Sequence, residues 1–272
     1  MYPFNYPTPQ GATLDIFDAP STTTGINVQS WVKPPNVGMI WITAVGAGGG
    51  GGTGSGDGTF FGYAGGGGSG AIVSVLVPAL FVPPELEIQV GQGGSATTDA
   101  LTATNTIISY NGTTLILADS ASNGSNATGS GATANGSGGA AGATASSSVE
   151  GMFAPFALQQ FTSGSSGTTG SAAQTLSTTT WTVGGASGSS STYNGQYGYS
   201  VGSPDSTAGT LSFAPIQTFG GNRRSYSTVL AANTARYRAP NGAGGGGGGS
   251  RQTSPTCPGH QGGHGLVIIS AW

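Results

Sequence analysis

Residues 37–52 read Val-Gly-Met-Ile-Trp-Ile-Thr-Ala-Val-Gly-Ala-Gly-Gly-Gly-Gly-Gly, an apolar stretch that changes abruptly into glycine. The apolar part carries large side chains at successive positions, which is typical of a strand buried on both faces. Glycine has no Cβ and loses more conformational freedom on folding than any other residue, so the strand is expected to end at Gly46. This junction predicts a β domain whose strands are joined by glycine-rich segments.

Three further stretches have strand character. Residues 71–77 are rich in β-branched side chains and end at Pro78, and residues 86–90 alternate between apolar and polar side chains. The last seven residues, 266–272, read Leu-Val-Ile-Ile-Ser-Ala-Trp. A terminus this apolar has to be buried, and we expect it to lie beside the strand at 37–45 and close the domain.

Residues 106–117 predict a β-hairpin. Asn111 and Gly112 tolerate the two positive φ angles of a type I′ turn, and apolar residues flank them on both sides. A two-residue turn at this point places Ile108 opposite Leu115 and Ile107 opposite Ile116.

The composition excludes several classes of protein. Of the 272 residues, 53 are Gly and 15 are Pro, and charged residues make up 6% against roughly 25% in an ordinary domain. Six Lys and Arg residues cannot neutralise a long run of phosphates, so we expect no nucleic-acid partner. No stretch approaches 18 consecutive apolar residues, which predicts no membrane insertion. The single cysteine, Cys257, cannot form an internal disulfide.

The glycine runs allow two arrangements. They can form polyglycine-II helices packed side by side through backbone hydrogen bonds, or loops laid over a sheet, and we favour the loops. Residues 118–148 are almost wholly Ala, Ser, Thr, Asn and Gly, and are expected to be loop or flexible surface. The predicted fold is therefore all-β, a jelly-roll-like β-sandwich of short strands with long Gly-rich loops, with short polyglycine-II segments as the alternative.

No constellation of residues predicts catalysis. Gly46, Gly48 and Gly51 match a dinucleotide fingerprint in spacing, but any glycine run does so, and no helix pattern follows. Cys257, His260 and His264 have the spacing of metal ligands, yet one chain offers only three donors. Three chains meeting on an axis could complete such a site, but we expect none. We predict a protein that is not an enzyme and holds no cofactor and no metal.

Two loop regions are candidates for contact with a partner. The first surrounds Tyr193, Tyr197 and Tyr199, and its composition of Tyr, Ser, Gly and Asn suits an adaptable recognition surface. The second spans Arg223 to Arg238, where Arg beside Tyr suits an acidic glycan or a protein. Hydrogen-bonding loop residues are the alternative for the second. Residues 1–30 are predicted to be a docking arm, and residues 31–272 a glycine-rich β domain. The candidates are Tyr193, Tyr197, Tyr199, Arg223, Arg224, Arg236 and Arg238 for a host or partner, and Tyr2, Phe4 and Tyr6 for docking.

The order of these features resembles the glycine-rich domain of bacteriophage tail fibres and related virion proteins. The resemblance rests on residues 31–34 and 39–48, the glycine run that follows, Val90-Gly91-Gln92-Gly93-Gly94, and the terminal strand at 265–272. It implies a non-enzymatic virion component, often trimeric, and in some members a tip adhesin with polyglycine helices and loops that contact the host.

From this resemblance we expect a phage virion structural protein, a tail-associated fibre or a host-recognition tip. It would act as a homo-oligomer, a trimer, in contact with other virion proteins and a host surface glycan or protein. The alternative is a capsid (head) decoration or head-fibre protein with the same fold.

Overall fold

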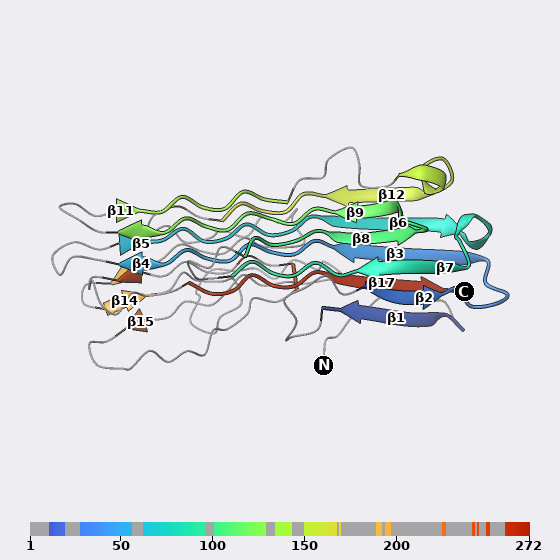
Figure 1. Ribbon diagram of the computed structural model, residues 1–272, viewed down its shortest axis with the longest axis horizontal. Helices are drawn as coiled ribbons and strands as arrows, with labels where there is room; N and C mark the ends of the chain where they lie inside the picture. Colours follow the sequence, from blue (N-terminus) through green and yellow to red (C-terminus); the bar gives the residue numbers. More distant parts are fainter. Residues whose placement is uncertain are drawn as a thin grey trace.

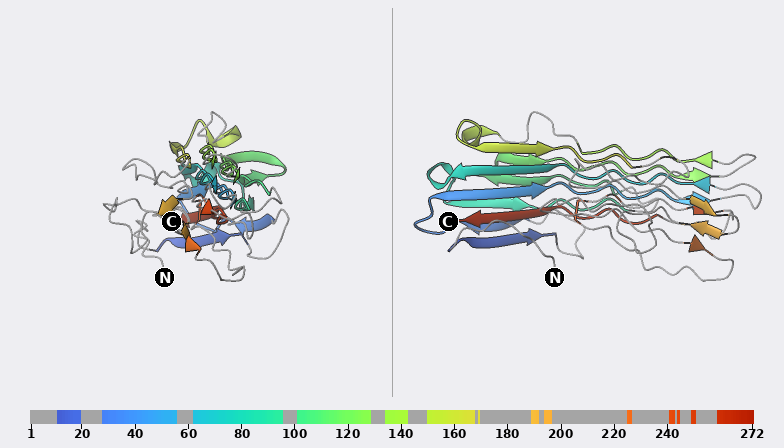
Figure 2. Two further views of the ribbon diagram at one scale, coloured as in Figure 1. Left: turned by 90° about the vertical axis from the view of Figure 1, so that its left-hand side faces the viewer. Right: turned by 180° about the vertical axis from the view of Figure 1, so that it is seen from behind.

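The protein is elongated, with two β-sheets at one end and glycine-rich segments that run from the sheets to the other end (Figure 1). The computed structural model describes residues 11–19, 28–55, 62–95, 101–128, 134–142, 150–167, 169, 189–191, 194–196, 225–226, 241–242, 244, 249–250 and 259–272. The C-terminus lies at the sheet end (Figure 2).

The two sheets are antiparallel and pack face to face as an open sandwich. The first has the order β1-β17-β3-β6-β12 and the second β2-β7-β8-β9. The strands of the first are β1 (Thr13–Asp18), β17 (Leu266–Ala271), β3 (Met39–Val45), β6 (Ile72–Pro78) and β12 (Leu158–Thr162). Those of the second are β2 (Val28–Val32), β7 (Glu85–Gln89), β8 (Thr106–Tyr110) and β9 (Thr113–Ala118). The predicted all-β sandwich is confirmed.

Alternate residues of β3, β6, β17 and the strands of the second sheet meet in one core between the sheets. Ile40 and Ile42 of β3 and Val75 of β6 face Leu86, Ile88 and Ile108 of the second sheet, and all are fully buried. The C-terminal strand β17 pairs with β3 from Leu266 opposite Val45 to Ala271 opposite Ile40. The prediction that the terminal residues close the domain beside the first strand is confirmed.

The predicted hairpin forms, but its predicted register is wrong. Asn111 and Gly112 have φ angles of 47° and 74°, as a type I′ turn requires. Ile108 lies opposite Ile116, and Ile107 opposite Leu117, because Leu115 is an extra residue in a β-bulge. The bulge turns Leu115 and Ile116, which are neighbours in sequence, into the core together.

The remaining elements are short. Two 3-10 turns, η1 (Ala79–Phe81) and η2 (Gly151–Phe153), are the only helices among the described residues, and neither could cross a membrane. Eight short strands complete the described part: β4 (Gly54–Ser55), β5 (Gly62–Tyr63), β10 (Ala127–Thr128), β11 (Ala134–Asn135), β13 (Ser189–Ser191), β14 (Asn194–Gln196), β15 (Ser225–Tyr226) and β16 (Gly249–Ser250).

The described glycine runs, 48–52 and 65–68, do not form the loops over a sheet that the sequence analysis favours, and most of the run at 244–249 lies outside the described residues. They continue the strands as extended segments joined by backbone hydrogen bonds at every third residue: Gly46, Gly49 and Gly52 donate to Ala71, Gly68 and Gly65 at 2.8–2.9 Å. A repeat of three residues with bonds only to neighbouring segments is that of polyglycine II. Seen along the molecule, these segments are small coils gathered side by side (Figure 2). We call the following segments the glycine bundle: 46–55, 62–71, 91–95, 119–128, 134–142, 163–167 and 259–265.

The prediction of loop or flexible surface for residues 118–148 is wrong wherever the structure describes them. Ala121 and Gly124 donate to Ala47 and Gly50 at 2.9 and 2.8 Å, and Gly139 donates to Gly66 at 2.8 Å. Side chains no larger than Ala, Ser and Asn suit this packing because backbones must approach closely. The backbone hydrogen bonds of the bundle thus replace the apolar side chains that the segment lacks.

The predicted docking arm spans two parts of the structure. Residues 1–10 and 20–27 lie outside the described residues, while β1 pairs with β17 at the edge of the first sheet. A docking role for residues 1–30 stays a prediction.

Candidate functional site

The glycine bundle holds a cluster of short strands at the end of the molecule away from the sheets. Figure 1 places β4, β5, β11, β14 and β15 there. β10 pairs with β4, and β11 and β16 both pair with β5, so the segments stay in register at their ends. The connections from β4 to β5 and from β10 to β11 therefore begin and end at this far end.

The close approach of backbones in the bundle depends on glycine at every third position. A Cβ added at Gly46, Gly49 or Gly52 would come within 2.0, 1.9 or 2.1 Å of the carbonyl oxygens of Asp119, Ser122 and Ser125. Real Cβ atoms essentially never approach another atom within 3.0 Å. These positions can therefore hold only glycine unless the neighbouring segment moves, which makes the bundle a dense and stiff support.

Two asparagine side chains extend the bonding pattern on one side of the bundle. The Oδ1 atoms of Asn123 and Asn126 each accept a backbone N–H, from Gly50 and Thr53 respectively, at 2.7 Å. The two asparagines are three residues apart, so they occupy the same face of their segment. Each satisfies a donor that no backbone carbonyl in the described segments accepts.

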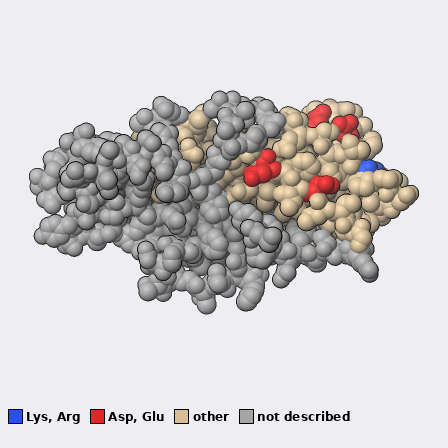
Figure 3. Space-filling view, turned by 90° about the horizontal axis from the view of Figure 1, so that it is seen from below, with Lys and Arg blue, Asp and Glu red and all other residues tan. Residues whose placement is uncertain are grey.

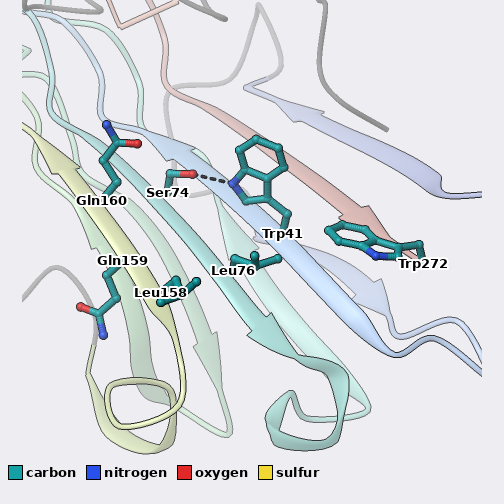
Figure 4. A pocket seen from close by; sticks show the side chains of 7 residues that line it. All are labelled: Trp41, Ser74, Leu76, Leu158, Gln159, Gln160 and Trp272. Carbon is teal, nitrogen blue, oxygen red and sulfur yellow. Dashed lines mark hydrogen bonds between the residues drawn. The ribbon is translucent and has the colours of Figure 1, made fainter. Parts of the chain in front are cut away.

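A pocket of about 380 Å³ lies at the opposite end, on the outer face of the first sheet (Figure 4). It is lined by Trp41, Ser74, Leu76, Leu158, Gln160 and Trp272. Strand pairing explains the grouping, because Trp41, Leu76 and Leu158 are directly opposite one another on β3, β6 and β12. Trp272 continues β17, and its backbone N–H donates to the Met39 carbonyl at 3.1 Å. This pairing sets the Trp272 indole diagonally beside Trp41.

The pocket residues differ in how firmly they are held. The Trp41 indole N–H donates to the Ser74 hydroxyl at 2.6 Å, and this hydroxyl lies 3.3 Å from that of Thr43. Leu158 is 73% exposed, and Gln160 beside it is also exposed. Gln159 borders the same pocket, but its side-chain amide points away and donates to the Ala154 carbonyl at 3.1 Å (Figure 4).

Among the described residues on the face shown in Figure 3, the few charged side chains lie over the sheet end. Lys33, the only lysine of the chain, donates to the carbonyls of Ala79 and Val82 at 3.0 and 2.7 Å, so it fixes the η1 turn. Glu87 accepts a hydrogen bond from Ser109 at 3.0 Å on the solvent side of the second sheet. Burial raises the pKa of Asp119, which stands where β9 passes into the glycine bundle.

None of the predicted partner-contacting residues belongs to the part of the chain that the structure describes. Tyr2, Phe4, Tyr6, Tyr193, Tyr197, Tyr199, Arg223, Arg224, Arg236 and Arg238 all lie outside the described residues. So does Cys257. His260 and His264 lie on a bundle segment and are buried, and the Nδ1 atom of His264 accepts the Gly93 N–H at 2.9 Å. Within the described ranges no three metal-ligating side chains come together.

The sequence profile of the glycine-rich domain matches residues 22–272. The chain belongs to the glycine-rich domain family. A comparison with curated proteins finds no match. The matched range of the glycine-rich domain begins after β1, although β1 pairs with the C-terminal strand along its whole length.

Neither the pocket nor the threefold spacing of this glycine-rich domain is among the predictions from the sequence. The apolar run at 37–45 predicts a strand buried on both faces, but the Trp41 side chain, on the outer face of β3, is only half-buried. The pocket could have been predicted from one step. Once the C-terminal strand is paired with β3, Trp41 and Trp272 both fall on the outer face of the sheet. The spacing of required glycines was hidden because runs of consecutive glycine contain every period.

Proposed function

We propose that this glycine-rich domain protein is a non-enzymatic structural component of a bacteriophage particle, a tail-associated fibre or tip that recognises the host. The observation that carries the proposal is the far end of the glycine bundle, where β4, β5, β10 and β11 lie paired at a distance from the sandwich. The resemblance of the strand and glycine anchors to phage tail-fibre proteins points the same way.

The construction suits recognition at a distance. Backbone hydrogen bonds at every third residue tie each bundle segment to several neighbours, so the support is stiff while its end connections can vary in sequence. Loops rich in Tyr, Ser, Gly and Asn supply adaptable contacts. Residues 186–251 of the sequence have this composition and contain the candidate residues Tyr193, Tyr197, Tyr199 and Arg223.

Exposed apolar side chains on the sandwich support assembly with other chains. Exposed apolar residues mark a contact surface where they form a contiguous patch. Val28 and Val32 are 56% and 68% exposed on the edge strand β2, and Leu80 on η1 is 86% exposed. We propose that the sandwich end contacts other virion proteins and further copies of the chain in a homotrimer.

Competition for adsorption tests the proposal. The purified protein is added to host cells before the phage that encodes it, and unadsorbed phage is counted. We expect the protein to bind the cells and reduce adsorption. A variant with Tyr193, Tyr197 and Tyr199 changed to Ala should lose this effect, whereas Leu101→Ser, at a side chain that is 53% exposed and has no proposed contact, should keep it. A wild-type protein that neither binds the cells nor competes would refute the recognition role.

A further inference from the structure

We propose that the pocket between Trp41 and Trp272 is a binding site for a neutral saccharide. The site lies on the sandwich, at the opposite end from the short strands β4, β5 and β11, and does not depend on the proposed function. It rests on three features of the pocket, which are its aromatic surface, its polar rim and its lack of charge.

The aromatic surface is open and fixed in place. The Trp41 indole is half-buried, and its N–H is bonded to Ser74 at 2.6 Å, so the ring cannot turn without losing that bond. The Trp272 indole stands diagonally beside it, and Leu76 lies between them and β12 (Figure 4). A pyranose ring has a face of C–H groups that packs against an indole and removes apolar area from water.

The rim offers hydrogen-bonding groups that match hydroxyls. The Gln160 amide carries both a donor and an acceptor, and Gln160 shares the outer face of β12 with Leu158. A sugar hydroxyl is likewise both donor and acceptor, so one amide can bond two neighbouring hydroxyls. An aliphatic ligand would leave this amide without a partner on binding.

The lining residues exclude a charged ligand. None of their side chains is ionisable, and the terminal carboxylate of Trp272, which accepts the N–H groups of Gly38 and Met39, is itself negative, so an acidic sugar or a phosphate would lose water without gaining a counter-charge. A protein partner is disfavoured by size, because a stable interface takes roughly 20 to 30 residues a side. The combination of indole, amide and absent charge selects a neutral oligosaccharide.

Binding can be followed at the site itself. The chain has four Trp residues, and the indole N–H signals of 15N-labelled protein report each one separately. Cellotetraose, maltotetraose and tetra-N-acetylchitotetraose serve as neutral probes, and trigalacturonic acid serves as the charged comparison. We expect at least one neutral probe, and not trigalacturonic acid, to shift the signals of Trp41 and Trp272.

Variants then separate a saccharide site from a protein contact. Trp272→Ala should weaken binding about tenfold, which corresponds to the loss of a stacking face worth about 1.4 kcal/mol. Gln160→Ala should weaken it as well, and Leu80→Ala, which is exposed outside the pocket, should leave it unchanged. The proposal is overturned if no neutral probe shifts the two signals. It is equally overturned if Trp272→Ala changes only the oligomeric state and not saccharide binding.

Discussion

Replacing Gly49 by alanine tests the packing of the glycine bundle. The added Cβ would lie 1.9 Å from the Ser122 carbonyl oxygen, and the segment 119–128 would have to retreat by roughly 1.5 Å or more for an ordinary contact. Four hydrogen bonds join this segment to its neighbours around Gly49. They run from Ala121 to Ala47, from Gly124 to Gly50, from Gly68 to Ser122 and from Gly50 to the Asn123 side chain.

The expected loss follows from those bonds. Each contributes about 0.5 to 1.5 kcal/mol, so losing four costs about 2 to 6 kcal/mol. Alanine also restricts the unfolded chain, which returns about 0.4 to 1 kcal/mol. We expect a net loss of about 1 to 5 kcal/mol out of a total stability of about 5 to 15 kcal/mol.

Gly38→Ala is the matched control, because a Cβ at Gly38 meets only the Trp272 carbonyl oxygen, at 3.8 Å. Urea denaturation followed by circular dichroism measures both variants. We expect Gly38→Ala to stay within about 0.5 kcal/mol of the wild-type protein. Equal stability of the two variants would show that the backbones around Gly49 are not in close contact.

Three further variants and one measurement on the unchanged protein probe other parts of the structure. Asn123→Ala leaves the Gly50 N–H without its side-chain acceptor and should lower the free energy of unfolding by about 1 to 3 kcal/mol in urea. Deleting residues 266–272 removes a strand from the interior of the first sheet, and size-exclusion chromatography should show no soluble folded protein. Through-hydrogen-bond scalar couplings should link the nitrogens of Gly46, Gly49 and Gly52 with the carbonyl carbons of residues 71, 68 and 65, and couplings at other spacings would contradict the threefold pattern. Burial raises the pKa of Asp119, so the folded state binds the carboxyl proton more tightly than the unfolded chain does. The contribution of Asp119 to the free energy of unfolding therefore falls as the pH rises from the usual pKa of the carboxyl group to its raised pKa. Asp119→Asn should therefore gain stability relative to the wild-type protein over that rise, and a constant difference in urea midpoints would contradict it.

The strands could be predicted because their signal is local. The apolar run at β3, the alternation at β7 and the terminal strand β17 each carry their pattern within a few residues, and the pairing of β17 with β3 follows from burying a terminus. The hairpin turn was equally local. Its register was not, because the bulge at Leu115 depends on a core that accepts two successive side chains from one strand.

The glycine bundle could be predicted only as one of two alternatives. Its stability comes from backbone hydrogen bonds, and these leave no side-chain pattern in the sequence. Residues 119–128 have the composition of a flexible loop, yet Ser122 and Ser125 supply carbonyls that face Gly49 and Gly52. The pocket was missed for a related reason, since Trp41 and Trp272 meet only after strands far apart in sequence are set in register.

The central claim is that the far end of the glycine bundle faces the host from the tail of a phage particle. Inserting a peptide tag between β10 and β11 and labelling intact particles with gold-conjugated antibody tests it by electron microscopy. The same tag placed after Trp272 marks the sandwich end. We predict gold at the tail for both tags, with the first tag farther from the particle than the second, because the proposed contacts with virion partners lie at the sandwich end. Gold over the head would contradict the account and make the protein a capsid decoration.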